Sequence, residues 1–342
     1  MTGGDVHGDV WARGARDDHA VNVATGGPPD WLRALLRREL DDALAAYPDE
    51  TAAAEAIAFR HGRDPDEVVL LNGAAQGYAL VARVLAPRRP AIVHPQFMEA
   101  ERVLPGATRV VLGEPFALDG ARVPTDADLV VVGNPTNPTG VLHRRADVRA
   151  LGRTVLVDEA FMDFVPGEPE TLAGGDRHGD GAGGDVIVLR SLTKILAVPG
   201  LRVGYLLAPP ALARRLRNAR PAWSVNAPAL VVARAAALHP ERLAPIVERA
   251  RRDREALAAA LRDLMKVHPG AAANFVLAEL PGDGPDALTL ATALRQDGIA
   301  IRPASTFPGL GSHHVRLTAR GGAADARLVQ ALGRRAVQGT PA

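Results

Sequence analysis

The chain has 342 residues, of which 47% are hydrophobic and 23% charged, with a net charge of +1 and no cysteine. These values predict a soluble, cytoplasmic globular protein that is long enough for a large domain and a smaller one. They exclude disulfides, thiolate catalysis and cysteine-ligated metal. The near-neutral charge and 4% aromatic content give no case for nucleic-acid binding, and no apolar run reaches the length of a membrane span.

The first two thirds of the chain predict an α/β fold. Residues 1–29 read as an extended arm with one short strand at 20–23, because glycine and proline pairs interrupt any helical period. Helices are expected from Asp30 to about Ala46 and then to about His61. Short β-branched runs alternating with helices then predict a mostly parallel seven-stranded sheet in a three-layer domain; the runs are 68–71, 91–93, 109–112, 128–132, 154–157, 186–189 and 201–208.

The pattern changes after residue 220. Alanine-rich helices dominate from about 226 to 265, including a long helix from Pro240, and strands at 274–277, 299–301 and 314–317 alternate with helices at 286–297 and 323–336. We therefore expect an arm (1–29), a large domain (30–235) and a small α+β domain (236–342). The stretch 174–185, rich in glycine and aspartate, predicts a surface loop.

Lys194 is unusual for this composition. Only two of the 40 lysines and arginines are lysines, Lys194 and Lys266. Arginine cannot replace lysine where an amine must lose its proton and attack a carbonyl. Lys194 follows a predicted strand together with Ser191 and Thr193, and Arg202 comes eight residues later. A surface lysine retained by chance is the alternative, but the position favours a catalytic amine.

Ligands of parallel α/β sheets gather at the carboxyl ends of the strands. The other strand ends offer a small-residue helix opening suited to phosphate, an aromatic ring, a turn stiffened by two prolines, and a carboxylate; these are Gly73-Ala74-Ala75, Phe97, the turn 133–140 with Asn137, and Asp158. Each has an ordinary explanation alone, such as a core ring or a helix cap. Together with the amine they suit an aromatic phosphate ester that carries an aldehyde and a ring nitrogen, which is pyridoxal 5′-phosphate.

On these motifs the chain resembles the fold-type I pyridoxal-phosphate enzymes of the class I/II aminotransferase superfamily, over essentially its full length. The resemblance implies that Asn137 contacts the phenolate oxygen of the cofactor, that Asp158 pairs with its pyridine nitrogen and that Lys194 carries it covalently. It further implies phosphate contacts from Ser191, Thr193 and Arg202, and a hold on the substrate carboxylate by Arg316. Tyr47 would reach the phosphate of a neighbouring subunit, so a homodimer with shared sites is expected.

Within the superfamily the chain is most similar to the threonine-phosphate decarboxylases of cobalamin biosynthesis, through the motifs at 47–49, 158–164, 189–205, 223–226 and 307–310. The related histidinol-phosphate aminotransferases usually carry tyrosine where this chain has Phe161, a position expected to face the phenolate oxygen. A non-enzymatic, cofactor-binding regulator would need a DNA-binding domain, and the sequence shows none.

The likeness implies decarboxylation of L-threonine O-3-phosphate to (R)-1-amino-2-propanol O-2-phosphate. The alternative is transamination of histidinol phosphate or a related amino compound with 2-oxoglutarate. Both substrates are small phosphorylated amino compounds, so a second anion site is expected, for which the candidates are His7, Asn22, Arg302 and Arg320.

Overall fold

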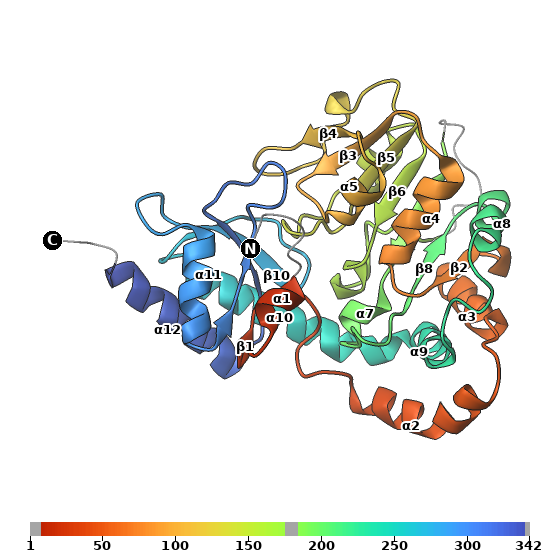
Figure 1. Ribbon diagram of the computed structural model, residues 1–342, viewed down its shortest axis with the longest axis horizontal. Helices are drawn as coiled ribbons and strands as arrows, with labels where there is room; N and C mark the ends of the chain where they lie inside the picture. The colour runs from red at the N-terminus through yellow and green to blue at the C-terminus, as the bar shows by residue number, and fades with distance from the viewer. Residues whose placement is uncertain (1–7, 175–183, 339–342) are drawn as a thin grey trace.

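The computed structural model describes residues 8–174 and 184–338, except for the side chains of 336–338. The described residues form three sheets, of seven, four and two strands. The two larger sheets lie in different parts of the molecule (Figure 1). The largest has the strand order β2-β8-β7-β6-β5-β3-β4. Its strands are β2 (Val68–Leu71), β3 (Pro90–His94), β4 (Thr108–Val111), β5 (Leu129–Gly133), β6 (Val155–Asp158), β7 (Val186–Arg190) and β8 (Gly204–Leu207).

The strands β3 to β7 pair in parallel, and only β8 runs against its two neighbours, β7 and β2. The predicted α/β fold with a mostly parallel seven-stranded sheet is therefore confirmed. Both faces of the central strands are buried, which is why their sequences are continuous apolar runs instead of alternating ones.

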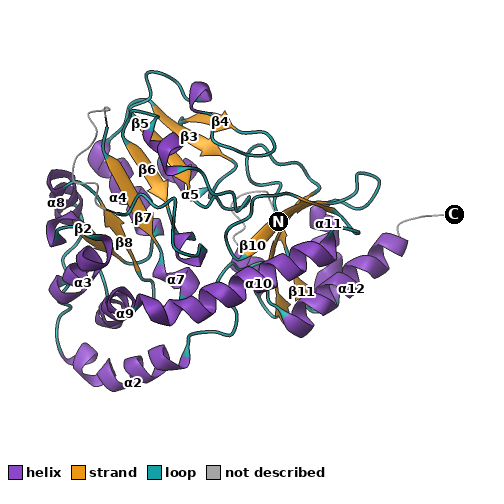
Figure 2. Cartoon of the chain, turned by 180° about the vertical axis from the view of Figure 1, so that it is seen from behind, coloured by secondary structure: helices purple, strands orange, loops and turns teal. Residues whose placement is uncertain are grey.

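Helices cover both faces of this sheet (Figure 2). In β5, Val130 and Val132 join one apolar cluster while Leu129 and Val131 join the other, as the alternation of a strand requires. The first cluster is shared with α2 (Asp30–Ala45), α3 (Thr51–His61) and α9 (Ala227–Leu238). The second is shared with α4 (Ala75–Leu85), α5 (Glu99–Val103) and α8 (Pro210–Asn218). Short elements join these layers, namely α6 (Arg145–Arg149), α7 (Leu192–Ile195) and the 3₁₀ turns η1 (Pro65–Glu67), η2 (Gly120–Arg122) and η3 (Met162–Phe164).

The second sheet is antiparallel, with the order β12-β13-β10-β9. Its strands are β9 (Lys266–Val267), β10 (Phe275–Glu279), β12 (Arg302–Pro303) and β13 (His314–Thr318). It shares an apolar cluster with α10 (Ala244–Leu261), α11 (Ala287–Gln296) and α12 (Gly322–Gln338). The 3₁₀ turn η4 (Pro240–Leu243) begins the long helix expected from Pro240. The expected boundaries at residues 29 and 235 stay a prediction.

The N-terminal arm differs from its prediction. The strand expected at 20–23 is wrong: the strand is β1 (Asp17–Asp18), which pairs with β11 (Ile299–Ala300), and a short helix α1 (Gly8–Ala12) precedes it. The amides of Ala20 and Val21 each donate to the Asp18 carboxylate at 2.9 Å. These backbone amides therefore form hydrogen bonds with a side chain instead of with a neighbouring strand.

Two further expectations concern loops and membranes. Most of the surface loop predicted at 174–185 lies outside the described residues. Within the described ranges, no helix has the length and apolar character to cross a membrane.

Candidate active site

A cavity of about 530 Å³ lies between the carboxyl ends of the parallel strands and the second sheet. Most of the predicted cofactor residues line this cavity, and they lie at or near the ends of the large sheet's strands. They are Ala74, Ala75, Phe97, Asn137, Asp158, Phe161, Ser191, Thr193, Lys194 and Arg202. The arm and the second sheet contribute three predicted substrate residues, Asn22, Arg302 and Arg316. The structure therefore brings together side chains from eight separate segments of the chain, at 22, 74–75, 97, 137, 158–161, 191–202, 302 and 316.

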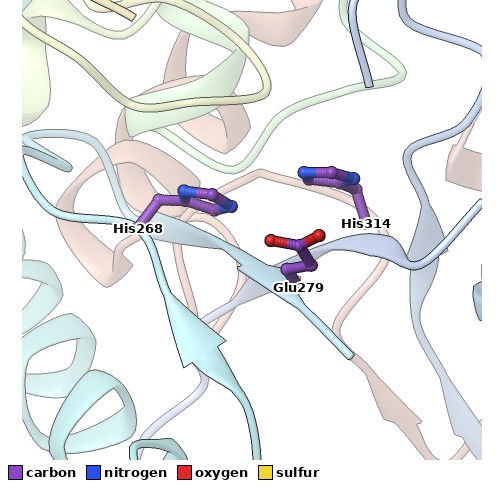
Figure 3. A group of neighbouring side chains, drawn as sticks. All are labelled: His268, Glu279 and His314. Atoms are coloured by element: carbon purple, nitrogen blue, oxygen red, sulfur yellow. The ribbon is translucent and has the colours of Figure 1, made fainter. Parts of the chain in front are cut away.

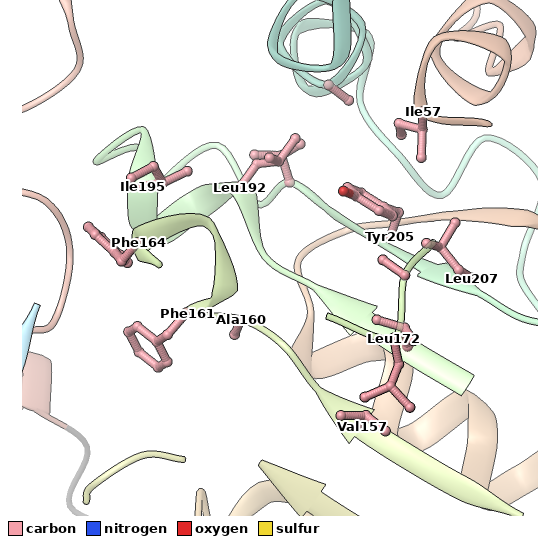
Figure 4. Close-up of a cluster of buried hydrophobic side chains, with 14 of the residues drawn as sticks. Ile57, Val157, Ala160, Phe161, Phe164, Leu172, Leu192, Ile195, Tyr205 and Leu207 are labelled. Atoms are coloured by element: carbon pink, nitrogen blue, oxygen red, sulfur yellow. The ribbon is translucent and has the colours of Figure 1, made fainter. Parts of the chain in front are cut away.

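Lys194 is held at the cavity by a short helix. Its neighbours Leu192 and Ile195 in α7 are buried in the large apolar cluster, beside η3 and Phe164 (Figure 4). Burial, with the charges of Arg316 and Arg202, lowers the pKa of the Lys194 amine to about 8, although Asp158 and Asp9 oppose this shift. At that pKa about a tenth of the amine is unprotonated at pH 7, far more than at the ordinary lysine pKa of 10.5, and the neutral amine is the form that a nucleophile or proton acceptor requires.

The loop before α4 and Arg202 form a close-packed cradle. Gly73 has a φ of +81°, and a Cβ at this position would collide with the Arg202 guanidinium. A Cβ on Gly204 would lie 2.7 Å from the carbonyl oxygen of Arg190 and 3.0 Å from the amide nitrogen of Ala74. The glycines thus let a helix opening, two hydroxyl residues and a guanidinium converge. This donor set fits a phosphate group.

Asp158 is held by a residue that the sequence reasoning missed. The Tyr78 hydroxyl donates to Asp158 Oδ2 at 2.5 Å, and the Ala160 amide donates to Oδ1 at 2.9 Å. Burial raises the pKa of Asp158, while these two hydrogen bonds and the charge of Lys194 oppose the rise. The available signal was a tyrosine near the start of a mostly apolar helix that follows a candidate phosphate loop.

Two buried arginines, Arg302 and Arg316, line the same cavity. Arg316 donates to Asn137 Oδ1 at 2.6 Å and to the carbonyl of Ala20, and Arg302 donates to Thr306 Oγ1 at 3.0 Å. No carboxylate of the described residues lies within salt-bridge distance of either guanidinium. Burial lowers the pKa of Arg302 to about 10, and burial together with the Arg302 charge lowers that of Arg316 to about 9. Two desolvated cations without an acidic partner favour an anionic ligand.

Phe161 lines the cavity and packs against a second ring. Its ring meets that of Phe275 edge to face at 5.0 Å, and the Arg316 guanidinium lies 5.3 Å over the same Phe275 ring. Phe161 offers no polar atom to the cavity, so a cofactor oxygen facing it would receive no hydrogen bond from this side chain.

Four predicted residues are not among those that line the cavity, and one of them, Gly73, packs instead against the Arg202 guanidinium. Tyr47 is 77% exposed and stacks on Trp223, with ring centroids 4.5 Å apart. Arg320 donates to the backbone carbonyls of Asp18, Val21 and Val23, so its guanidinium fastens the arm and does not line the cavity. His7 lies outside the described residues.

A second group of titratable residues lies at the small sheet: Glu279 ends β10, His314 begins β13, and His268 directly follows β9 (Figure 3). His268 Nδ1 lies 3.0 Å from Glu114 Oε1, and Gly311 donates its amide to His314 Nδ1 at 3.1 Å. Because the Nδ1 of a neutral His314 then accepts, its Nε2 carries the proton and has no lone pair for a metal. We interpret the group as a polar contact between the small sheet and the segment after β4.

The fold and the site together define a class of protein, an α/β enzyme with a lysine amine set between a phosphate-type cradle and a buried arginine pair. Residues 19–334 match the family aminotransferase class I and II, and the chain belongs to this family.

The known proteins that it resembles carry two different activities in their names. A histidinol-phosphate aminotransferase of Mycobacterium tuberculosis is 44% identical over 327 residues, which cover 92% of this chain and 86% of the relative. A threonine-phosphate decarboxylase of Salmonella typhimurium is 32% identical over 341 residues, covering 92% and 90%. The crystal structure of a histidinol-phosphate aminotransferase from Clostridium acetobutylicum matches with a TM-score of 0.82 at 23% identity, covering 93% of this chain and 98% of that one, and supports the fold.

Proposed function

We propose that the protein is a pyridoxal 5′-phosphate-dependent decarboxylase of L-threonine O-3-phosphate, with (R)-1-amino-2-propanol O-2-phosphate as product. The observation that carries the proposal is the buried pair Arg302 and Arg316, which faces the same cavity as Lys194. A phosphorylated amino acid brings a carboxylate and a phosphate together, one for each guanidinium. Histidinol phosphate carries a single anionic group. The similarity to the Salmonella threonine-phosphate decarboxylase supports the same choice.

The cavity residues fit the cofactor. Its phosphate would be held by the amides that open α4 and by Ser191, Thr193 and Arg202; Asn137 would contact its phenolate oxygen, and Phe97 its ring. Asp158 would pair with the ring nitrogen, and Lys194 would carry the cofactor covalently. When bound, pyridoxal phosphate supplies a protonated ring that withdraws electrons from a bond at the substrate Cα.

The arginines would decide which bond at Cα reacts. Anchoring the carboxylate at Arg316 and the phosphate at Arg302 leaves the substrate little freedom to rotate, so the bond presented to the ring is fixed. Lys194, with its pKa near 8, would hold a proton close to Cα and deliver it once CO2 has left. Asn22 lies on the same cavity as a further contact for the phosphate.

The second candidate is transamination of histidinol phosphate or a related amine with 2-oxoglutarate. It is favoured by the 44% identity to the Mycobacterium tuberculosis histidinol-phosphate aminotransferase. In that reaction Lys194 would move the Cα proton to the cofactor, and the two arginines would receive the dicarboxylate in the second half-reaction.

A homodimer in the cytoplasm completes the proposal. Tyr47 and Trp223, 77% and 60% exposed, form a stacked aromatic pair on the surface. In the proposed dimer, Tyr47 would contact the cofactor phosphate of a second copy, which agrees with its exposure and with its absence from the cavity of its own chain. Light scattering should give a mass of about twice 35.9 kDa.

The deciding experiment follows carbon and nitrogen separately. Purified protein loaded with pyridoxal phosphate is incubated with O-phospho-L-threonine labelled with ¹³C in the carboxyl group, with no oxo acid added. The proposal predicts labelled CO2, one equivalent of aminopropanol phosphate per turnover, and a loss of at least tenfold in kcat/KM in Arg302→Ala. Pyridoxamine phosphate formation without CO2, with turnover of histidinol phosphate and 2-oxoglutarate, would establish the aminotransferase instead.

A further inference from the structure

Tyr78 and Asp158 form a buried pair at the inner wall of the cavity. Both side chains line the cavity, and Tyr78 is 2% exposed. The phenolic hydroxyl donates to Asp158 Oδ2 at 2.5 Å, and the other carboxylate oxygen accepts only the Ala160 amide among the described residues. The hydroxyl is therefore the one side-chain donor to this carboxylate in the described ranges.

A buried carboxylate keeps its charge only if donors or cations replace its lost hydration. A phenol donating to a carboxylate is a charge-assisted hydrogen bond, stronger than one between neutral groups. Burial raises the pKa of Asp158 and the Tyr78 hydrogen bond lowers it, while burial and the carboxylate charge both raise the pKa of Tyr78. Both effects on Tyr78 keep the proton on the phenol, which is therefore the donor in its hydrogen bond to Asp158.

The local sequence brings Tyr78 to this position. A Cβ on the preceding Gly77 would lie 2.6 Å from Leu189 Cδ1 and 3.1 Å from Leu71 Cδ1, so α4 can approach the sheet this closely only with glycine there. The Tyr78 ring also meets Phe97 edge to face, with centroids 6.2 Å apart and an interplanar angle of 62°. One side chain therefore contacts both the carboxylate and the aromatic ring expected at the cofactor.

We propose that Tyr78 is a positioning residue for the cofactor, which keeps Asp158 ionised and aimed at the ring nitrogen and sets the orientation of Phe97. This inference rests on the proposed binding of pyridoxal phosphate, and it adds a residue that acts through Asp158 without contacting the substrate.

The test compares two identical chemical changes. Tyr78→Phe removes the hydroxyl from Asp158, whereas Tyr205→Phe removes an equally buried hydroxyl that contacts His61 at 2.9 Å, away from the cavity. We expect Tyr78→Phe to bind pyridoxal phosphate about tenfold more weakly and to shift the pH titration of the bound cofactor's absorbance. Tyr205→Phe should stay within about twofold of wild type.

A double-mutant cycle separates positioning from general packing. If Tyr78 acts through the carboxylate, its removal in an Asp158→Asn background should change the affinity for pyridoxal phosphate less than about twofold. A tenfold loss that persists in that background would overturn the inference. Wild-type affinity and an unchanged pH titration in Tyr78→Phe would overturn it as well.

Two further outcomes are distinguishable. If Tyr78→Phe does not fold, 3-fluorotyrosine labelling replaces this variant. The ¹⁹F resonance of Tyr78 should then shift in Asp158→Asn, while the resonance of Tyr205 should not. An unshifted Tyr78 resonance would contradict the pairing.

A wild-type protein that binds no pyridoxal phosphate would overturn the proposed function and this inference together, whereas a tightly binding Tyr78→Phe overturns only the inference.

Discussion

Lys194 and Lys266 are the same side chain in opposite surroundings. Lys194 lines the cavity beside two guanidinium groups, and burial lowers its pKa to about 8. The Lys266 side chain is 54% exposed and donates to Glu114 at 2.5 Å, and this hydrogen bond raises its pKa above the ordinary 10.5. The environment of each amine, not its identity, decides which one can act as a nucleophile.

This contrast predicts different pH profiles of acylation. In the apo protein, brief treatment with acetic anhydride should label Lys194 with a midpoint near pH 8, because only the neutral amine reacts. Lys266 should be labelled with a midpoint above 10.5. Peptide mass spectrometry measures both in one sample, so Lys266 is the internal control. A common midpoint for the two lysines would contradict the account of the site.

Among the elements, β8 packs closely against both its neighbour β7 and the loop before α4. Gly204 begins β8, and a Cβ there would press on the carbonyl of Arg190 and on the amide of Ala74, which belongs to the cradle. Gly200, four residues earlier, has nothing within 4 Å of its Cβ position. The two glycines form a matched pair, since only one is required by packing.

Gly204→Ala should destabilise the protein by about 1–3 kcal/mol, because the new methyl group meets backbone atoms that cannot rotate away. Gly200→Ala should change the free energy of unfolding by less than about 0.5 kcal/mol. Urea titrations at pH 7 measure both. Equal stability of the two variants would show that the segment from β7 to β8 relaxes more freely than the structure indicates.

The elements that the sequence predicted well are those determined by their own residues. The strands at 68–71 and 186–189 are continuous β-branched runs, and the structure places β2 and β7 there. The arm was mispredicted because its carbonyls are satisfied by Arg316 and Arg320, nearly 300 residues away. Such partners leave no local periodicity to detect.

Distant partners also explain which site residues could be predicted from the sequence and which could not. Asp158 ends the buried strand β6 and Lys194 follows the buried strand β7, so the sheet brings them together without further information. Tyr78 acquires its role only from a partner 80 positions later. Arg320 has the charge expected of an anion site, but the arm folds over it and uses its donors. The regular order of strands and helices therefore predicts which residues meet at the strand ends, but it does not predict which side chains hydrogen-bond to one another.

At the scale of the whole molecule, an ion pair joins the arm to α12. Asp17 in β1 accepts two hydrogen bonds from Arg327 in α12, at 2.8 and 2.6 Å, and one from Arg16 at 3.0 Å. The hydrogen bond from Arg327 is the main cause that lowers the pKa of Asp17 to about 2. Because Asn22 and Ala20 of the arm line the cavity, this ion pair also supports the site.

The lowered pKa fixes the sign of a pH effect. The stabilisation from Asp17 is present above its ordinary pKa of 3.8 and is lost as the pH falls through about 2. Asp17→Asn should therefore lower the free energy of unfolding by about 1–2 kcal/mol at pH 7, allowing for the partial exposure of Arg327. The difference from wild type should shrink below pH 3.8. Asp126→Asn, which removes an exposed pair with Arg89, should have little effect at any pH.

The central claim is that Lys194 carries the cofactor, and one measurement tests it directly. Protein loaded with pyridoxal 5′-phosphate is reduced with borohydride, digested and analysed by mass spectrometry, beside Lys194→Ala and Lys266→Ala. The account predicts a pyridoxyl group on Lys194 in wild type and in Lys266→Ala, and none in Lys194→Ala. A pyridoxyl group on Lys266 or on the chain's N-terminus in place of Lys194, or cofactor absorbance near roughly 400–430 nm retained in Lys194→Ala, would contradict it.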